Sequence, residues 1–403
     1  MEKASRRSMI SATLGGGAAL LAAGAAAAQA PEPTGPGVGS NVVGPRNMPV
    51  ERQNPDILAP PRTDHGGLPN MKWAFADSHM RLENGGWARE TTTRELPVSK
   101  EMAGVNMRLN AGAIRELHWH KATEWALMLK GDARVTIVDQ EGRNFIDDVT
   151  EGDLWFFPSG LPHSIQGTGS DGCEFLLVFD DGGFSEDNTF LISDWFNHTP
   201  REVLAKNFQT SADAFGKVPK ELYIFEAPVP PALARDQTSD PKGSTPKPFT
   251  FKNLYSMPAK TFKGGAVRIV DQRNFAMTTT TAALVEIEPG AMRELHWHPT
   301  VDEWQYYLGG KGRMTVFGSS SNARTFDFQA GDVGYAPFAM GHYIENTGTE
   351  TLRFLEMFRY PMYEDVSLRQ WMAVLPPELI EAHLHLPRAV IDQLPKTKTL
   401  VVG

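Results

Sequence analysis

Apolar residues along this chain fall into short runs separated by glycine, proline and aspartate. Short runs of β-branched and aromatic residues bounded by turn residues are typical of β-strands. Many such strands favour a sandwich or jelly roll, so we expect a fold dominated by β-sheet, with two similar β domains and short flanking helices. The predicted strands are 105–109, 123–129, 133–138, 154–157 and 174–179, then 283–287, 303–308, 313–317, 333–335 and 352–358.

Helices are predicted at the borders of these two strand sets. Thr199 and Pro200 indicate a helix start, with Thr199 at the N-cap and Pro200 in the first turn. Segments 367–375 and 377–384 are predicted to be helical near the C-terminus. The glycine-rich run 309–312 lacks the spacing of a phosphate-binding loop and lies between two predicted strands, which indicates a hairpin turn.

The strand sets divide the chain into five parts. Residues 1–30 are expected to be a twin-arginine-type signal peptide, because Arg6 and Arg7 precede an Ala/Gly/Leu-rich run and 28–30 has the small residues of a cleavage site. A general secretory signal is the alternative, and both predict export, here to the periplasm. Residues 31–70 are rich in Pro, Gly and Asn and predict an extended arm. A first domain at 71–225, a proline-rich linker at 226–248 and a second domain at 249–403 complete the chain.

One hexapeptide, Arg-Glu-Leu-His-Trp-His, occurs once in each strand set, at 115–120 and 293–298. Side chains two residues apart on a strand project to the same face. His118 and His120 are therefore expected to point together, as are His296 and His298. The tryptophan between each pair is expected to point the other way.

A carboxylate and a third histidine recur at matching places. Glu124 and His163 follow the first pair of histidines, and Glu303 and His342 follow the second. Equivalent residues of the two sets are 178 or 179 positions apart. The repeated arrangement predicts two metal sites, each with three imidazoles and one carboxylate.

These ligands limit the chemistry of the predicted sites. Three neutral imidazoles and one carboxylate leave a divalent ion with a net positive charge and, in octahedral geometry, two open positions. Such a site suits a small anion together with a second small molecule such as dioxygen. Zinc remains a competitor on ligand type, and ligand type alone does not single out manganese.

Composition excludes several other classes of function. The net charge of -9 and the lack of a long Lys/Arg run argue against a nucleic-acid partner. Beyond the N-terminal segment, no apolar stretch reaches the length of a membrane span. The single cysteine, Cys173, permits no intramolecular disulfide.

The two His-x-His motifs, with the downstream Gly-x5-Pro and His, resemble the paired motifs of the bicupins. From about residue 50 to the C-terminus the chain is similar to the oxalate decarboxylases, most specifically at 115–125 and at the segment Ser185-Glu186-Asp187-Asn188-Thr189-Phe190. The resemblance implies two cupin domains, each a double-stranded β-helix or jelly roll. It also implies two manganese ions per chain, bound by His118, His120, Glu124 and His163 and by His296, His298, Glu303 and His342, and a requirement for dioxygen.

The resemblance also assigns roles around the metals. It implies that Arg115 binds oxalate, with Arg293 as its counterpart, and that Glu186 is the acid of a mobile lid that supplies a proton. Glu356 matches a second candidate acid. Arg115 lies an odd number of residues before His118, so a bend or bulge is required to bring it to the metal face.

One departure concerns the lid. The family's common lid reads Ser-Glu-Asn-Ser-Thr, whereas Asp187 follows Glu186 here. Two neighbouring carboxylates would raise the pKa of one of them if both approached the site. Tyr223 and Tyr363 match tyrosines near the two centres of the family.

The expected reaction is the decarboxylation of oxalate to formate and carbon dioxide in the N-terminal domain, which alone has the lid. An oxalate oxidase, which releases hydrogen peroxide, and a non-catalytic metal-binding bicupin are the alternatives. The resemblance also implies a homo-oligomer, a hexamer or a trimer. In such an assembly Trp119 and Trp297 meet across subunits, with core packing as the alternative.

Overall fold

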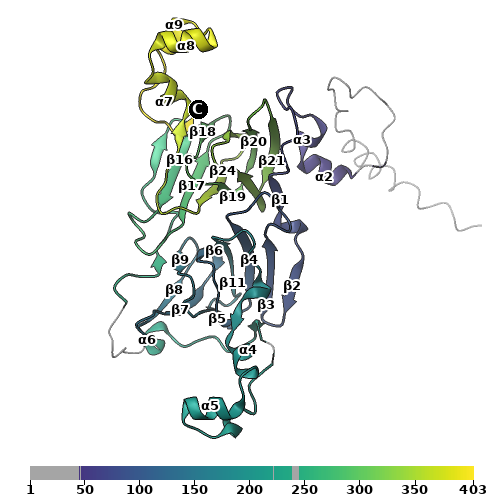
Figure 1. The fold of residues 1–403 in the computed structure, drawn as a ribbon, viewed down its shortest axis with the longest axis vertical. Helices are drawn as coiled ribbons and strands as arrows, with labels where there is room; N and C mark the ends of the chain where they lie inside the picture. Colours follow the sequence, from purple (N-terminus) through teal and green to yellow (C-terminus); the bar gives the residue numbers. More distant parts are fainter. Residues whose placement is uncertain (1–44, 46, 221, 238–244) are drawn as a thin grey trace, which may run out of the picture. The chain divides into compact units, whose positions relative to one another are not determined.

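A computed structural model describes residues 45, 47–220, 222–237 and 245–403 (Figure 1). The predicted signal peptide at 1–30 lies outside these residues, as do residues 31–44 and 46 of the predicted arm. Residues up to 62 form a unit of their own, which contains α2 (Met48–Gln53) and α3 (Pro55–Leu58). The expectation of an extended arm is therefore wrong for 48–58, where the Asn47 side chain caps the first helix and a proline occupies the first turn of each.

The rest of the chain, from residue 63, contains two halves of similar construction, each built from two antiparallel sheets. We call residues 80–225 with β14 the N-terminal half and residues 260–402 with β1 the C-terminal half. The ten predicted strands are confirmed, with ends that differ by at most two residues. The hairpin turn is also confirmed, because Gly310 adopts a positive φ of 79° between two paired strands.

In the N-terminal half, one sheet has the order β14-β9-β6-β11-β4-β3-β2 and the other β12-β5-β10-β7-β8, with β13 also paired to β5. The strands are β2 (Met80–Glu83), β3 (Gly86–Thr91), β4 (Ala103–Leu109), β5 (Ile114–Trp119), β6 (Glu124–Gly131), β7 (Ala133–Val138), β8 (Asn144–Val149), β9 (Leu154–Phe157), β10 (His163–Gly167), β11 (Cys173–Phe179), β12 (Phe190–Leu191), β13 (Ile224–Phe225) and β14 (Thr250–Phe251).

The C-terminal half repeats this plan with sheets β1-β22-β19-β24-β17-β16-β15 and β21-β20-β23-β18-β25, and β26 pairs with β18. Its strands are β1 (Lys72–Ala74), β15 (Lys260–Phe262), β16 (Gly265–Val270), β17 (Thr281–Ile287), β18 (Met292–Trp297), β19 (Glu303–Gly309), β20 (Lys311–Phe317), β21 (Ala323–Gln329), β22 (Asp332–Ala336), β23 (Gly341–Asn346), β24 (Leu352–Phe358), β25 (Val366–Ser367) and β26 (Val401–Val402).

The two halves exchange short strands. β1 precedes the N-terminal half in sequence but pairs with β22, while β14 precedes the C-terminal half and pairs with β9. Figure 1 shows β1, in dark blue, alongside the green strands of the C-terminal half. Each half therefore completes its larger sheet with residues that lie next to the other half in the sequence.

Strand alternation places the apolar side chains in two cores. On β6, Ala126 and Met128 pack inside the N-terminal half, whereas Trp125 and Leu127 pack with side chains of the C-terminal half. Because both faces of β6 are buried, its residues 125–129 are continuously apolar rather than alternating. The two larger sheets thus share one apolar interface that fixes the halves against each other.

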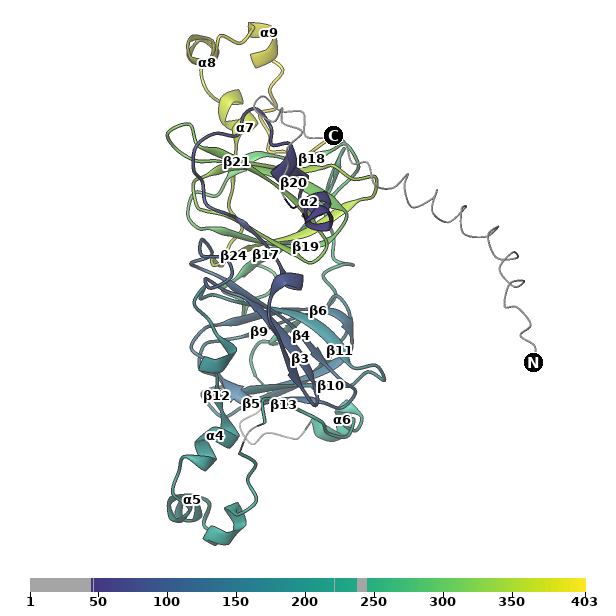
Figure 2. The same cartoon turned by 90° about the vertical axis from the view of Figure 1, so that its right-hand side faces the viewer.

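Helices lie outside the sheets (Figure 2). They are α4 (Ile192–Asn197), α5 (Arg201–Phe208) and α6 (Leu233–Asp236) after the N-terminal strands, and α7 (Leu368–Ala373), α8 (Pro377–Leu384) and α9 (Arg388–Ile391) near the C-terminus. There are also 3-10 turns at Phe75–Asp77, Glu186–Asn188 and Ala212–Phe215. None of the helices in the described part of the chain is long and apolar enough to cross a bilayer.

The predicted start of α5 is wrong by one residue. Pro200 is its N-cap, and the hydroxyl of Thr199 instead donates to the carbonyl of Trp195 at the end of α4. Within the predicted linker, α6 contacts the N-terminal half, because Arg134 pairs with Asp236 at 2.5 Å. Residues 238–244 of the linker lie outside the described part.

Candidate metal centres and lid

A β-bulge brings the arginine of each hexapeptide to the face of its histidines. In the pairing of β5 with β10, His118 is opposite His163, but Arg115 is opposite Ile165. Three residues on β5 therefore span two on β10, and Arg115 and Glu116 are both buried in succession. The same shift occurs between Arg293 and His296 on β18. The predicted bulge is confirmed in both halves.

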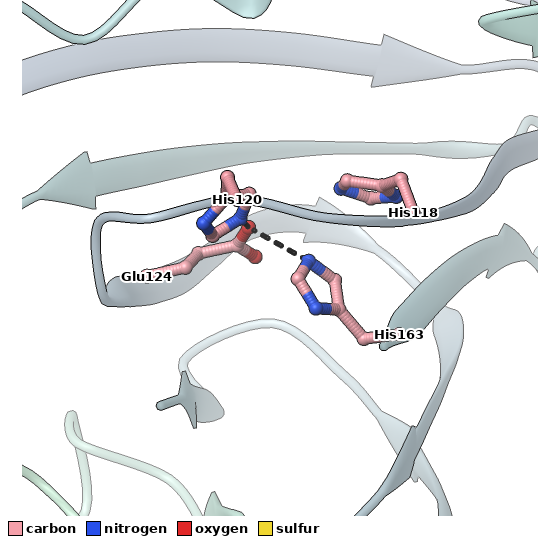
Figure 3. Close-up of side chains that lie close together, drawn as sticks. All are labelled: His118, His120, Glu124 and His163. Carbon is pink, nitrogen blue, oxygen red and sulfur yellow. Dashed lines mark hydrogen bonds and ion pairs between the residues drawn. The ribbon is translucent and has the colours of Figure 1, made fainter. Parts of the chain in front are cut away.

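The four predicted ligands of the N-terminal half converge in a buried cluster, shown in Figure 3. His118 lies on β5 and His120 directly follows that strand. Glu124 begins β6 after the bend, and His163 begins β10. Their possible ligand atoms all lie within 4.8 Å of one another. Oε2 of Glu124 is 3.2 Å from Nε2 of His120 and 3.5 Å from Nε2 of His163.

The C-terminal half repeats this cluster. Its ligand atoms also lie within 4.8 Å of one another. Oε2 of Glu303 is 2.9 Å from Nε2 of His298, 2.7 Å from that of His342 and 3.9 Å from that of His296. The structure therefore brings all eight predicted ligands into two sites, one per half.

The hydrogen bonds around each cluster fit a bound cation. In all six histidines Nδ1 lies 2.5–3.0 Å from a backbone carbonyl oxygen, which can only accept, so Nδ1 carries the proton and Nε2 presents a lone pair. Nε2 of His163, His296 and His298 is buried and makes no hydrogen bond within the described residues. A cation between the imidazoles would satisfy these atoms.

The carboxylates are oriented in the same way. Oε1 of Glu124 accepts a hydrogen bond from the indole of Trp155 at 2.9 Å, and Oε1 of Glu303 accepts one from Gln305 at 2.8 Å. The remaining oxygen of each carboxylate faces the histidines. These contacts fix the ligands before any ion binds, which is typical of metal sites.

Burial keeps several of the imidazoles neutral and ready to bind a cation. It lowers the pKa of His118, with help from the nearby Arg115, and it also lowers the pKa of His163 and His296. Burial alone would raise the pKa of Glu124, but its close contacts with His120 and His163 lower it below its usual range. Neutral imidazoles around an ionised carboxylate match the ligand set of a divalent ion.

Beside the N-terminal cluster, Arg115 and Glu186 form a buried ion pair. The segment that connects β11 to β12, residues 180–189, is here called the lid. Its Glu186 accepts hydrogen bonds on Oε2 from Arg115 at 2.8 Å and from the hydroxyl of Tyr223 at 2.6 Å. The Arg115 guanidinium also stacks on the Tyr223 ring, 4.1 Å from its centroid. The lid acid is therefore held inside the site by two donors.

Asp187, the departure in the lid sequence, points to solvent. Its side chain is 79% exposed and pairs with Arg81 at 3.2 Å. Arg81 stacks on the outer side of Tyr223, 3.7 Å from the ring centroid. Only one of the two neighbouring carboxylates therefore enters the site.

The C-terminal arginine is held by fixed partners. Arg293 donates to Glu356 at 2.9 Å, to the Tyr363 hydroxyl at 2.7 Å and to Asp365 at 3.0 Å. Asp365 is itself paired with Lys398 at 2.6 Å. Glu356 has a raised pKa because it is fully buried, although Arg293 opposes the shift. Arg293 is thus enclosed by groups anchored in the sheet and the C-terminal segment.

The strand register explains why Arg115 and Arg293 have different carboxylate partners. Glu356 of β24 is opposite Ala283, whereas the equivalent place in the N-terminal half is Leu177 of β11, opposite Val105. Leu177 offers no carboxylate to Arg115. The ion-pair partner of Arg115 is instead Glu186 of the lid. Asp365 was missed in the sequence, although it follows Glu186 by 179 positions, as Glu303 follows Glu124.

The tryptophans of the hexapeptides point away from the metal clusters, as expected. Trp119 stacks on Phe190 and contacts Trp195 edge-on, each with centroids 5.6 Å apart. Trp297 contacts Trp371 of α7, also at 5.6 Å. Trp195 is 63% exposed and Trp371 49% exposed.

Two of the cavities that the lid lines reach the metal cluster or Glu186. One, of about 570 Å³, reaches His120 and is lined by Phe184 and Thr189 among others. The other, of about 440 Å³, reaches Glu186 and Tyr223. Movement of the lid would open the buried metal cluster to solvent through either cavity.

Two adjacent lid glycines provide a matched test of how the lid is anchored. Gly182 exchanges backbone hydrogen bonds with Thr93 and Lys100, and a Cβ added there would lie 1.9 Å from the carbonyl oxygen of Ser99. We expect Gly182→Ala to displace this anchor at a cost of about 1–3 kcal/mol, as overpacked sites do. Hydrogen exchange of the lid amides and the thermal unfolding midpoint measure the effect.

Gly183→Ala is the control for this substitution. An added Cβ would approach only the Asp181 side chain, at 3.4 Å, which is ordinary van der Waals contact. We expect lid exchange close to that of the unmodified chain. Equal effects of the two substitutions would contradict the anchoring role of Gly182.

Comparison with known proteins gives consistent results. Residues 75–214 and 253–391 each match the Cupin family. Oxalate decarboxylase OxdC of Bacillus subtilis (strain 168) is 58% identical over 374 residues, covering 92% of this chain and 97% of the relative. A probable oxalate decarboxylase of Arthroderma benhamiae is 40% identical over 372 residues, covering 91% of this chain and 92% of the relative.

Solved structures agree in fold. The structure of oxalate decarboxylase from Bacillus subtilis at pH 4.6 has a TM-score of 0.89 and 57% identity, and the match covers 92% of this chain and 97% of that chain. A Bacillus subtilis oxalate decarboxylase studied for the EPR parameters of its Mn(II) centers has a TM-score of 0.89 and 56% identity, covering 92% and 99%. The match therefore spans both metal clusters and the lid.

Proposed function

The chain belongs to the cupins and, within them, to the oxalate decarboxylase family, and from this we propose that it splits oxalate into formate and carbon dioxide at its N-terminal centre. The single observation that carries the choice of centre is the buried contact of Arg115 with Glu186 beside the metal cluster. Arg115 can bind the substrate and Glu186 can donate a proton to it. Glu186 lies on the lid, a segment that can move.

Each centre binds one manganese ion through its three imidazoles and one carboxylate. When bound, manganese together with dioxygen supplies the one-electron oxidation that makes the C–C bond of oxalate easy to break. The residues fit this ion because hard oxygen and imidazole ligands with neutral Nε2 atoms suit a divalent metal. The protein's own contribution is to bind, orient and exchange a proton with the substrate.

Arg115 is the proposed binding group for oxalate. Its guanidinium is 2% exposed, and stacking on Tyr223 fixes its plane. A carboxylate of oxalate can take the place that Glu186 occupies on Arg115, because both offer the same planar pair of oxygens. Binding of substrate would therefore release Glu186 from Arg115 while the hydroxyl of Tyr223 still holds it.

Glu186 is the proposed proton carrier. The monoanion of oxalate loses its proton, its C–C bond breaks to release carbon dioxide, and one proton returns to the carbon of the remaining fragment to give formate. A single carboxyl group close to the substrate can accept the first proton and deliver it in the last step. Burial of Glu186, 5% exposed, keeps that proton from exchanging with water during turnover.

The C-terminal centre is proposed to have a supporting role. Arg293 is surrounded by Glu356, Tyr363 and Asp365, so an oxalate that binds there would have to displace anchored carboxylates. The predicted roles of Arg293 in binding substrate and of Glu356 in catalysis stay predictions. The ion pairs instead support a centre whose metal stabilises the fold or tunes the first centre.

The proposal is tested by product analysis. Purified, manganese-loaded protein is incubated with oxalate at mildly acidic pH, and formate, carbon dioxide and peroxide are measured together. A decarboxylase yields about one formate per oxalate consumed. Peroxide in place of formate would indicate the oxidase, and unchanged oxalate would indicate a binding protein.

Export and assembly belong to the same proposal. The paired arginines at 6–7 and the cleavage-like residues at 28–30 support export through a twin-arginine route to the periplasm. The exposed aromatic residues beside Trp119 and Trp297 support a homo-oligomer, a trimer or hexamer, because exposed apolar patches mark interaction surfaces. Cell fractionation and light scattering are the respective measurements.

A further inference from the structure

Glu90 is a carboxyl group beneath the lid that the proposed reaction does not use. It belongs to β3, opposite Val105 of β4, and lines a cavity of about 320 Å³. Asp187 of the lid lines the same cavity, and the carboxyl group of Glu90 lies close to the backbone of Glu186. Oε2 of Glu90 is buried and has no hydrogen-bond partner among the described residues. Glu90 therefore places a carboxyl group of the sheet next to the lid.

Three carboxyl groups come together at this place. Glu186 and Asp187 of the lid both act on Glu90 electrostatically, and Arg94 is the cation that opposes them. Arg94 is itself engaged by Glu95 at 2.8 Å, and Arg81 by Asp187. The other polar groups that line the cavity are His79, Arg89 and the hydroxyl-bearing Tyr223.

A buried carboxylate beside two others is far more unfavourable than a buried neutral carboxyl. Burial, followed by the negative charge of Glu186, raises the pKa of Glu90 to about 7. The closed lid creates part of this environment, because it supplies both Glu186 and Asp187. An open lid would remove their charges and admit water, and the pKa would move back towards its usual range.

We propose that Glu90 is a positioning residue for the lid: its neutral carboxyl permits the closed position beside Glu186 and Asp187, whereas its ionised carboxylate is repelled by them and favours release. This inference rests on the proposed function of Glu186 as the proton carrier. It makes lid position depend on pH through a residue outside the group of catalytic side chains.

The direction of the effect follows from linkage. The pKa of Glu90 is higher with the lid closed than with it open, so the closed lid binds the proton more tightly. The closed position is therefore favoured below the open-state pKa, loses its advantage as pH rises towards about 7, and loses no more above that value. Each unit of difference between the two pKa values changes the ratio of closed to open lid about tenfold.

The test is hydrogen exchange of lid amides in manganese-loaded protein without substrate, from pH 5 to 8, corrected for intrinsic exchange. We expect protection of residues 182–189 to fall about tenfold or more between pH 5 and 7 and then level off. Glu90→Gln, which stays neutral and keeps an acceptor oxygen, should remove this fall. Glu95→Gln removes a charge from the same cavity and should leave the fall in place.

Arg94→Gln keeps Glu90 and gives a second test should the first variant not fold. Without the opposing cation, the pKa of Glu90 rises and the fall in protection should extend to higher pH. A flat profile in the unmodified protein, an unchanged profile in Glu90→Gln, or no shift in Arg94→Gln would each overturn the proposal. Formate release by the unmodified protein tests the role of the site independently, since the exchange experiment uses no substrate.

Discussion

Glu186→Gln is expected to lower formate production by about 100-fold or more while two metal ions per chain remain bound. General acid–base catalysis by a positioned carboxyl contributes about 100-fold to 10,000-fold, and an amide cannot carry the proton. The substitution preserves shape, because the amide oxygen can still accept from Arg115 and Tyr223, which both donate to Oε2 in the structure. Formate and peroxide assays with metal analysis of the same sample measure the outcome.

Glu141→Gln is the control for this change. Glu141 is 49% exposed between β7 and β8 and pairs with Arg143, so it loses the same charge far from the lid. It should retain formate production. Formate production that survives Glu186→Gln would exclude Glu186 as the proton carrier, and loss of metal in that variant would point instead to a structural effect on the cluster.

His163→Ala and His342→Ala are expected to separate the two centres. Each removes one imidazole from a buried cluster of four ligands, so bound metal should fall from about two ions to about one per chain. Loss of the N-terminal ion should lower formate production by about 100-fold or more, since metal-assisted steps are worth several kcal/mol. His342→Ala should lose much less activity but show a lower thermal midpoint, because a bound ion stabilises the folded state.

Metal analysis, formate release and thermal unfolding are measured on both variants at one metal concentration. The two variants also control for the loss of packing, since each removes a histidine side chain from an equivalent strand. Equal loss of formate in both variants would contradict the assignment of turnover to the N-terminal centre. Greater loss in His342→Ala would assign turnover to the other half.

Much of the fold is predictable because its signals are local. The strands follow from short apolar runs, and the ligand clusters follow from the twofold occurrence of the hexapeptide. The bulge at Arg115 follows from a count along the strand, since an odd separation cannot place two side chains on one face. In each case the prediction needs only neighbouring residues or a repeat.

Features that depend on distant segments escape such reasoning. Nothing near Glu90 in the sequence indicates that the lid, almost a hundred residues later, will cover it. The short strands β1 and β14 carry too few residues for a periodic signal, and their partners lie in the other half. Asp365 is an intermediate case, because the repeat spacing could have revealed it.

The exchange of β1 and β14 limits how the chain can be divided in the laboratory. A cut within the linker leaves residues 72–74 on one fragment and residues 250–251 on the other, each separated from the sheet it completes. Sheets with exposed edges tend to aggregate, because their unpaired N–H and C=O groups accept strands of other molecules. Isolating one manganese ion for spectroscopy therefore requires rearranged fragments, in which β1 is joined to the C-terminal half and β14 to the N-terminal half.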